Sequence, residues 1–406
     1  MKTGISLEEA QTMLLDLVGP VKECRVPLDQ AGGKVLCQDI WSDIDLPPFD
    51  KSPLDGYALR AKDTVAANLT QPTNLEVIEE VRAGYTACKE VAPGTAIKVL
   101  TGAPIPTGAD VVIKFEDVDR DGNKLKVFSP LKAGSNIIRA GEDVNQGEII
   151  AKRGTMLNPP LVGLLASIGV DLVPVFGKVK VAILSTGDEL LDPSEKLSSG
   201  KIYNSNLHSI SAYCSRLGTE PIPMGIAPDE EAAIVECISR AFVDADLVIT
   251  TGGVSVGDFD IVPMAINKVG AEVLFWKLDM KPGSPLIAGR LNNKIVIGLS
   301  GNPAAALITF ELVVVPLIKK MIGFARQLPP RISATLADDF NKPSGQRRFL
   351  RAELQHFKDS NYVKLTGEQS NGVLKSMIEC NALIDVPAGS GPLLAGQEVI
   401  AILIQS

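Results

Sequence analysis

The sequence predicts a multidomain protein of the α/β plus β class, built around a doubly wound, mostly parallel sheet. With 406 residues, the chain is too long for one ordinary hydrophobic core, which favours about three or four domains. Its middle part alternates apolar, β-branched runs with helical patterns, as parallel sheets do. The segments on either side carry short strand patterns separated by turn residues, which indicates smaller β-rich units.

Three runs in the middle of the chain are expected to be strands of that sheet. They span residues 179–185, 247–249 and 294–299, with helical patterns at residues 206–217, 229–243 and 261–269. Such units form right-handed crossovers, so the strands lie parallel and their C-terminal ends meet at one edge. The loops TGDE, TTGGVSVGD and SGNP should therefore converge on one crevice. In SGNP, Asn302 is placed as the N-cap and Pro303 as the first residue of a long apolar helix.

The loop TTGGVSVGDFD gives the strongest indication of chemistry. Gly252 and Gly253 remove two side chains where the backbone leaves the sheet, so main-chain N–H groups could approach an anionic oxygen. Asp258 and Asp260 follow where a divalent cation could bridge to that anion. The alternative is structural, a tight turn in which Asp260 caps a helix that starts at Ile261. A dinucleotide site of the Rossmann type is not expected, because no G-x-G-x-x-G follows the first strand.

The composition narrows the functional classes. A formal net charge of -8 argues against general nucleic-acid binding. The six cysteines lack C-x-x-C spacing, which argues against a zinc site and a disulfide framework. The N-terminus lacks the core of a signal peptide, and the most apolar stretch, residues 304–318, is too short for a membrane span, so we expect a cytoplasmic protein without membrane association. Only His208 and His356 are present, which leaves acid and lysine chemistry.

The flanking segments suggest three further units. Residues 5–31 and 158–168 show helical patterns, and short strand patterns dominate between them. After residue 325 the pattern is again β, with apolar runs at residues 373–378 and 398–404, enough for a small barrel or sandwich. We assign residues 1–45 and 146–176 to a helical linker domain, 46–145 to an inserted β-rich domain, 177–325 to the α/β domain and 326–406 to a C-terminal β-barrel.

Three turn-rich motifs of the inserted segment place polar side chains beside glycine. PPFDKSPLDGYA offers the carboxylate of Asp55, LTGAPIP offers the hydroxyl group of Thr101, and RAGEDV offers the carboxylates of Glu142 and Asp143. Singly, each motif is more often a turn than a site. Together with the expected crevice, they form a set that can be compared with known families.

The chain resembles the molybdopterin molybdenumtransferases, the family of bacterial MoeA and of the E domain of gephyrin. Nearly the whole chain takes part, through the ordered motifs DGYA, TGAP, GED, STGDEL, TTGGVSVGD, KPG-P and GNP. The resemblance implies an elongated four-part subunit, a homodimer and a sheet domain like that of the molybdopterin adenylyltransferases. It also implies an enzyme that transfers molybdate onto the dithiolene of adenylylated molybdopterin, cleaves the pyrophosphate link and releases AMP with Mg²⁺. Molybdopterin adenylyltransferase and molybdoenzyme maturation proteins would be its partners.

The resemblance assigns candidate roles to individual residues. The expected catalytic set is Asp55, Thr101, Asp143, Glu189 and Asp260. Glu189 and Asp260 are also the expected metal ligands, whereas Asp258 is expected to shape its loop. Asp229 matches another acidic position of the family, although a helix N-cap is the plainer interpretation. The expected substrate-binding residues are Thr186, Gly187, Asp188, Gly252, Gly253, Val254, Ser255, Lys277, Lys281, Pro285, Gly301, Asn302 and Pro303.

Molybdate is a tetrahedral dianion, so its site needs cations and hydroxyl groups. The resemblance places this oxyanion site at Lys281, Pro285, Arg351 and Ser376. Without the family match, ordinary surface charge would be the preferred interpretation of the cationic side chains.

The chain departs from the family pattern at three places. Ser284 replaces the usual second lysine of KPGKP, SPLDGYA replaces SAMDGYA, and SGNPAA, with Ser300 and Ala305, replaces PGNPVS. The loss of a lysine weakens the local attraction for anions, and Ala305 removes a hydroxyl group. The carboxylates expected beside the pyrophosphate all remain. Cleavage of the adenylylated pterin is therefore a firmer expectation than molybdate affinity, and tungstate insertion stays open.

Two other classes of function also stay open. A paralogue without insertion activity would act as a scaffold or as a carrier of the finished cofactor, although retention of every carboxylate argues against it. A different nucleotide pyrophosphatase or amidase on the same sheet domain would leave Arg351 and Ser376 without a task.

Overall fold

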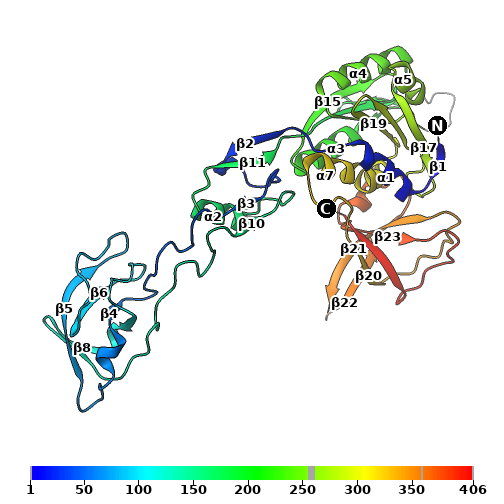
Figure 1. Cartoon of the computed structure of the whole chain (residues 1–406). Helices are drawn as coiled ribbons and strands as arrows, with labels where there is room; N and C mark the ends of the chain where they lie inside the picture. The colour runs from blue at the N-terminus through cyan, green and yellow to red at the C-terminus, as the bar shows by residue number, and fades with distance from the viewer. Residues whose placement is uncertain (1, 255–260, 358–359, 405–406) are drawn as a thin grey trace.

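The structure is a computed structural model that describes residues 2–254, 261–357 and 360–404. The subunit is elongated (Figure 1). A seven-stranded sheet and a closed barrel lie at one end, a six-stranded sheet lies at the other, and a narrow waist with two small sheets connects them. The predicted fold class is confirmed. The domain limits given above stay a prediction.

The seven-stranded sheet is mostly parallel, in the order β1-β17-β18-β19-β16-β12-β15. Only β18 runs antiparallel to its two neighbours. The C-terminal ends of the other strands therefore share one edge, as predicted. The bounds are β1 (Lys2–Ile5), β12 (Lys180–Thr186), β15 (Glu220–Ala227), β16 (Leu247–Thr251), β17 (Glu272–Leu278), β18 (Ile287–Leu291) and β19 (Lys294–Leu299).

Helices cover both faces of this sheet because alternate residues of its strands point to opposite sides. Val181 and Ile183 of β12 pack in the core that holds α1, α3, α6 and α7, whereas Ala182 and Leu184 pack in the core that holds α4 and α5. The bounds are α1 (Leu7–Leu17), α3 (Ser205–Arg216), α4 (Glu231–Asp244), α5 (Val262–Lys268), α6 (Pro303–Thr309) and α7 (Val315–Ile322). A π-helical turn, η4 (Phe310–Val314), joins α6 to α7.

Two predicted elements are wrong. The helical pattern of residues 5–31 ends at Leu17, because Gly19 and Pro20 interrupt it, and the chain continues as β2 (Glu23–Pro27). The apolar run at residues 373–378 forms a short 3₁₀ turn, η5 (Leu374–Met377), and no strand. Its apolar residues recur at intervals of three and four, which is helical spacing.

The waist is formed by two passages of the chain, one outgoing and one returning. Strand β2 pairs with β11 (Leu172–Phe176), and β3 (Ile40–Trp41) pairs with β10 (Ile149–Ala151). Helix α2 (Pro159–Ser167) begins after Asn158, whose side chain accepts a hydrogen bond from Leu161 N–H. The predicted helix at residues 158–168 is thus confirmed, and the six-stranded sheet is inserted between the two passages.

The two β units complete the fold. The six-stranded sheet has the order β7-β4-β6-β5-β9-β8 and contains β4 (Gly56–Leu59), β5 (Thr73–Val81), β6 (Thr95–Val99), β7 (Val111–Lys114), β8 (Val118–Asp121) and β9 (Lys124–Val127). The barrel contains β20 (Arg331–Leu336), β21 (Arg348–Phe357), β22 (Ser360–Leu365), β23 (Ala382–Val386) and β24 (Glu398–Leu403). Among the described residues, no helix is long and apolar enough to cross a membrane.

Candidate functional site

A cavity of about 450 Å³ opens at the C-terminal edge of the seven-stranded sheet. The loops that follow β12, β16 and β19 converge there, as the sequence predicts, and the segment before α3 closes one side. Of the predicted residues, the cavity brings together Thr186, Gly187, Glu189, Gly252, Gly253, Val254, Pro285, Gly301, Asn302 and Pro303. Ser255, Asp258 and Asp260 lie outside the described residues.

The glycine turn after β16 is packed too closely for any side chain. Gly252 has a φ of 94°, and a Cβ atom there would lie 2.4 Å from the carbonyl oxygen of Thr186. The N–H of Gly252 already donates to the carbonyl of Leu299 at 3.1 Å. The N–H groups of Gly253 and Gly301 have no acceptor within the described part of the chain, so both are available to a ligand.

Two buried asparagines at the start of α3 carry polar atoms without a hydrogen-bond partner in the described structure. Asn204 Oδ1 accepts from Ser185 Oγ at 3.0 Å, and Asn206 Nδ2 donates to the carbonyl of Gly301 at 2.9 Å. The remaining amide atoms, Asn204 Nδ2 and Asn206 Oδ1, are buried without a partner in the described structure. Buried polar groups without partners cost free energy, which a bound ligand would offset.

The charged side chains that line the cavity are acidic. Glu189 and Asp229 contribute carboxylates, and no lysine or arginine is found among the described lining residues. An anionic ligand in this cavity therefore needs a cation to offset the repulsion. Carboxylate oxygens fit Mg²⁺, which takes oxygen ligands. Of the two predicted metal ligands the structure describes Glu189 only, and no group of three acidic, histidine or cysteine side chains suited to a metal occurs among the described residues.

Asp229 is a lining residue of the cavity, and its interpretation as a helix N-cap is wrong. Helix α4 begins at Glu231 with Glu230 as its N-cap residue. The Asp229 N–H donates to Asp188 Oδ1 at 3.1 Å, and the Asp188 N–H lies 3.4 Å from Asp229 Oδ2. These reciprocal bonds join the loops after β12 and β15 at the mouth of the cavity.

The predicted lysines lie at the end of β17 and in the loop that leads to β18. Lys277 belongs to the end of β17, has a φ of 72° and places its ammonium 5.2 Å from the ring centroid of Trp276. Pro285 lines the cavity, whereas Lys281 is exposed outside it. Ser284, which replaces the family's lysine, donates from its Oγ to the carbonyl of Leu278 at 2.8 Å. The serine thus closes the loop on itself.

Arg351, in β21, and Ser376, in η5, are buried and do not line the cavity. Arg351 shares its face of β21 with Phe349, which packs in the core of the seven-stranded sheet, whereas Leu350 and Ala352 point into the barrel. The surface-charge interpretation is therefore wrong for Arg351, which is 0% exposed and whose pKa is lowered by this burial. Its Nη2 donates to the carbonyls of Glu368 and Ser370 at 2.9 and 3.1 Å, while Nε and Nη1 have no partner in the described structure. Ser376 Oγ donates to the carbonyl of Val373 at 2.6 Å.

The loop held by Arg351 reaches the cavity through α6. The N–H of Ala304, in the first turn of α6, donates to the carbonyl of Asn371 at 3.1 Å. Asn302 is the N-cap residue and Pro303 begins the helix, as predicted. Arg351 is therefore coupled to the cavity through the backbone of this loop.

Asp55 and Thr101 adjoin β4 and β6 of the six-stranded sheet, which the waist separates from the seven-stranded sheet (Figure 1). The N–H and the hydroxyl group of Thr101 both donate to Asp55 Oδ1, at 2.7 and 2.8 Å. These hydrogen bonds hold the pKa of Asp55 below its usual value. Asp143 is exposed beside a second hollow, lined also by Leu46 and Lys51. One chain therefore does not bring these acidic residues to the glycine turn.

Comparison with known proteins agrees with this arrangement. Family profiles match the MoeA N-terminal region (domain I and II) over residues 5–169, a probable molybdopterin binding domain over residues 182–320, and the MoeA C-terminal region (domain IV) over residues 333–404. The molybdopterin molybdenumtransferase of Bacillus subtilis (strain 168) is 38% identical over an alignment of 410 positions, which covers 100% of this chain and 95% of the relative. The chain belongs to the molybdopterin molybdenumtransferase family.

Further members of this family support the same assignment. The molybdopterin molybdenumtransferase of Staphylococcus epidermidis is 36% identical over 405 residues, which cover 100% of this chain and 97% of the relative. A crystal structure of the MoeA protein of Pyrococcus horikoshii superimposes with a TM-score of 0.87 at 32% identity, over 99% of this chain and 100% of the other. The family predicted from the motif order is confirmed, as is its transferase class.

The sequence analysis missed three lining residues of the cavity, because they lie outside the motifs shared with the molybdopterin molybdenumtransferases. Tyr203, Asn204 and Asn206 line the cavity just before and at the start of α3. The pattern N-S-N ahead of an amphipathic helix was the available signal, since asparagine is a preferred N-cap residue. It would have placed this helix start at the same sheet edge as the glycine turn.

Proposed function

We propose that the protein inserts molybdate into adenylylated molybdopterin and releases AMP, as a step of molybdenum cofactor biosynthesis. The observation that carries the proposal is the cavity at the sheet edge, which combines open backbone donors, unpaired buried amide atoms and carboxylates. Such a set suits a ligand that has both a pyrophosphate and a polar ring system. The family membership supplies the identity of that ligand.

In this proposal, Gly253 and Gly301 donate their N–H groups to the pyrophosphate. Asn204 and Asn206 hydrogen-bond the polar rings of the ligand through their unpaired amide atoms. Glu189, together with Asp260, would hold Mg²⁺, and magnesium supplies positive charge that offsets the charge of the pyrophosphate. Cleavage adds water across the anhydride bond, and carboxylates orient that water.

The molybdate would be recognised next to the same loops. Arg351 has two buried guanidinium donors without partners, which an oxyanion would satisfy. Ser376 is buried as well, and Lys281 stands on the loop that adjoins β21. Tungstate has the same charge and shape, so we include it as a second substrate to be compared.

The proposed active site is shared between two copies of the chain in a homodimer. Asp55, Thr101 and Asp143 are polar and exposed. Asp55 and Thr101 adjoin strands of the six-stranded sheet, whereas the cavity lies at the edge of the seven-stranded sheet, across the waist (Figure 1). A second copy would bring these residues to the cavity of the first. A cytoplasmic location and transfer from a molybdopterin adenylyltransferase to molybdoenzyme maturation proteins belong to the same proposal.

The test is AMP release from adenylylated molybdopterin by the purified protein. We expect release that requires both molybdate and Mg²⁺, with a smaller or equal rate when tungstate replaces molybdate. Adenylylated compounds without a pterin serve as the control for general pyrophosphatase activity. If AMP does not rise above background, the protein is no insertion enzyme, and equal cleavage of the control compounds would make it a nucleotide pyrophosphatase instead.

A further inference from the structure

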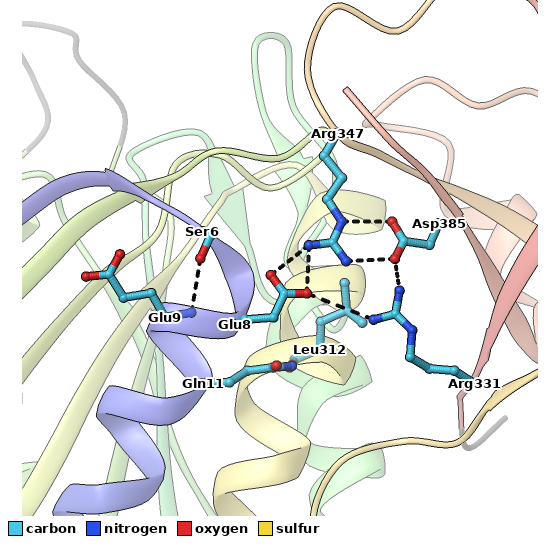
Figure 2. A network of polar contacts seen from close by, with 8 residues as sticks. All are labelled: Ser6, Glu8, Glu9, Gln11, Leu312, Arg331, Arg347 and Asp385. Carbon is cyan, nitrogen blue, oxygen red and sulfur yellow. Dashed lines mark hydrogen bonds and ion pairs between the residues drawn. The ribbon is translucent and has the colours of Figure 1, made fainter. Parts of the chain in front are cut away.

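A network of four charged residues joins the barrel to the edge of the seven-stranded sheet (Figure 2). Arg347 donates from Nε and Nη2 to the two carboxylate oxygens of Asp385, at 2.8 and 2.7 Å. Its Nη1 donates to both oxygens of Glu8 in α1, at 2.7 and 2.8 Å. Arg331 also pairs with Asp385 and lies 3.9 Å from Glu8. Two carboxylates thus raise the pKa of Arg347 and fix its guanidinium plane.

The backbone of Arg347 holds Lys281 at the same time. The N–H of Lys281 donates to the carbonyl of Arg347, and the N–H of Phe349 donates to the carbonyl of Lys281, both at 2.8 Å. Lys281 therefore forms a parallel bridge beside Arg348, at the start of β21. A shift of the Arg347 backbone would move Lys281 with it.

The loop of Lys281 is also fixed on its other sides. The N–H of Asp279 donates to the carbonyl of Ile5 at 2.8 Å, and Glu8 follows in the first turn of α1. At Gly283, whose φ is 90°, a Cβ atom would lie 2.2 Å from Thr309 Cγ2. The loop therefore packs closely against α6 on this side and is bonded to the barrel through Lys281 on another.

The charged network is suited to positioning and not to substrate binding. All three guanidinium nitrogens of Arg347 donate to Asp385 or Glu8, in four hydrogen bonds. Asp385 is only 8% exposed, so its pairing with Arg347 is shielded from solvent. Glu8 is more exposed, and its contribution is correspondingly smaller.

We infer that Arg347, held by Glu8 and Asp385, is a positioning residue that sets Lys281 for the molybdate step. The inference rests on the proposed function. Arg347 does not touch the substrate; it acts through its carbonyl group and the bridge to Lys281. Because Lys281 belongs to the oxyanion side of the site, loss of the network should weaken the use of molybdate more than the use of the pterin.

The experiment compares three variants of the full-length protein. Arg347→Met removes the four hydrogen bonds of Arg347 and leaves Arg331 paired with Asp385, Glu8→Gln removes the charge of the acceptor in α1, and Glu9→Gln is the matched control. Glu9 is the next residue of the same helix and pairs only with exposed Lys2, at 2.6 Å. The readouts are the KM values for molybdate and for adenylylated molybdopterin, and hydrogen exchange in the peptide that covers residues 279–286.

We expect Arg347→Met to raise the KM for molybdate about tenfold and Glu8→Gln about threefold, with the KM for the pterin within about twofold of wild type. Faster exchange of the 279–286 peptide should accompany both changes. Glu9→Gln should alter neither readout.

Unchanged molybdate KM values in both network variants, or equal rises for the two substrates, would overturn the inference. If Arg347→Met does not fold, Glu8→Gln decides, because its side chain is largely exposed. If the wild-type protein releases no AMP, the proposed function fails. Hydrogen exchange then still decides whether Arg347 holds the Lys281 loop.

Discussion

The cavity at the sheet edge and the carboxylate loops of the inserted unit differ in how far the surrounding structure encloses their polar groups. At the sheet edge, buried asparagines, a glycine turn without room for a Cβ atom and a helix start enclose about 450 Å³. In the inserted unit, Asp55 is exposed and is fixed by the two hydrogen bonds from Thr101. Under the proposed function, the cavity is preorganised within one chain, whereas the inserted unit, as the acidic half of the proposed shared site, would act only on the cavity of a second copy.

The largest effect is expected from the acidic half. Asp55→Asn keeps the size of the side chain and an oxygen to accept from Thr101, but removes the charge. We expect AMP release to fall about 1,000-fold with no change in Tm, because charged acid–base or metal-orienting groups contribute about 10²–10⁴-fold. Glu80→Gln, in a surface ion pair of the same sheet, is the control. A loss below tenfold would mean that Asp55 is not part of the reaction.

The binding half is tested at the glycine turn. Gly252→Ala should reduce AMP release about 100-fold, because the left-handed conformation costs about 1–2 kcal/mol for alanine and the new Cβ atom collides with the Thr186 carbonyl. Gly225→Ala is the matched control: it has a φ of 82° in the same sheet, but open space around the new Cβ atom. Equal losses in both variants would attribute the effect to backbone strain alone.

A smaller effect is expected from the residue that orients Asp55. Thr101→Ala removes one of two hydrogen bonds to Asp55 and should lower AMP release about tenfold. Because these bonds lower the pKa of Asp55, their loss raises it, so the acidic limb of the activity profile should move to higher pH. Thr101→Ser keeps the hydroxyl group and should retain the wild-type profile. If the acidic limb of Thr101→Ala does not shift, protonation of Asp55 is not the cause of the loss of activity at low pH.

The smallest loss of activity is expected when chains with a defect in the inserted unit are mixed with chains with a defect in the cavity. This experiment also tests most directly whether the two regions act together across a dimer. Co-refolded Asp55→Asn and Gly252→Ala chains should recover about one quarter of wild-type activity, since half of the dimers would be mixed and each would contain one intact shared site. Size-exclusion chromatography with light scattering checks that mixed dimers form. No recovery in a sample that contains mixed dimers would mean that each site is built from one chain.

The parts of the site that follow a strand could be predicted from the sequence. The loops after β12, β16 and β19 were found because buried parallel strands are apolar runs whose ends share an edge. The positions of Asn302 and Pro303 could be predicted because the residues preferred at the start of a helix are set by local backbone conformation and hydrogen bonding.

The remaining parts depend on contacts between distant segments. The burial of Arg351 follows from the closure of the barrel and the packing of a loop against α6, which no local pattern encodes. The antiparallel β18 and the coupling of Lys281 to Arg347 likewise arise only when β17, β18 and the barrel meet. The mutual bonds of Asp188 and Asp229 have the same origin, and local sequence favoured a simple cap instead.

The waist has a mechanical consequence for the proposed shared site. It consists of two chain passages joined by the short β2–β11 and β3–β10 pairs, and these passages carry the six-stranded sheet, in which β4 begins directly after Asp55. A small rotation at these pairs is multiplied by the length of the arm and displaces Asp55 far more than the glycine turn. Substitutions in the waist should therefore misplace Asp55 relative to the cavity of the partner copy. They should lower turnover and leave the affinity of the cavity for its ligand unchanged.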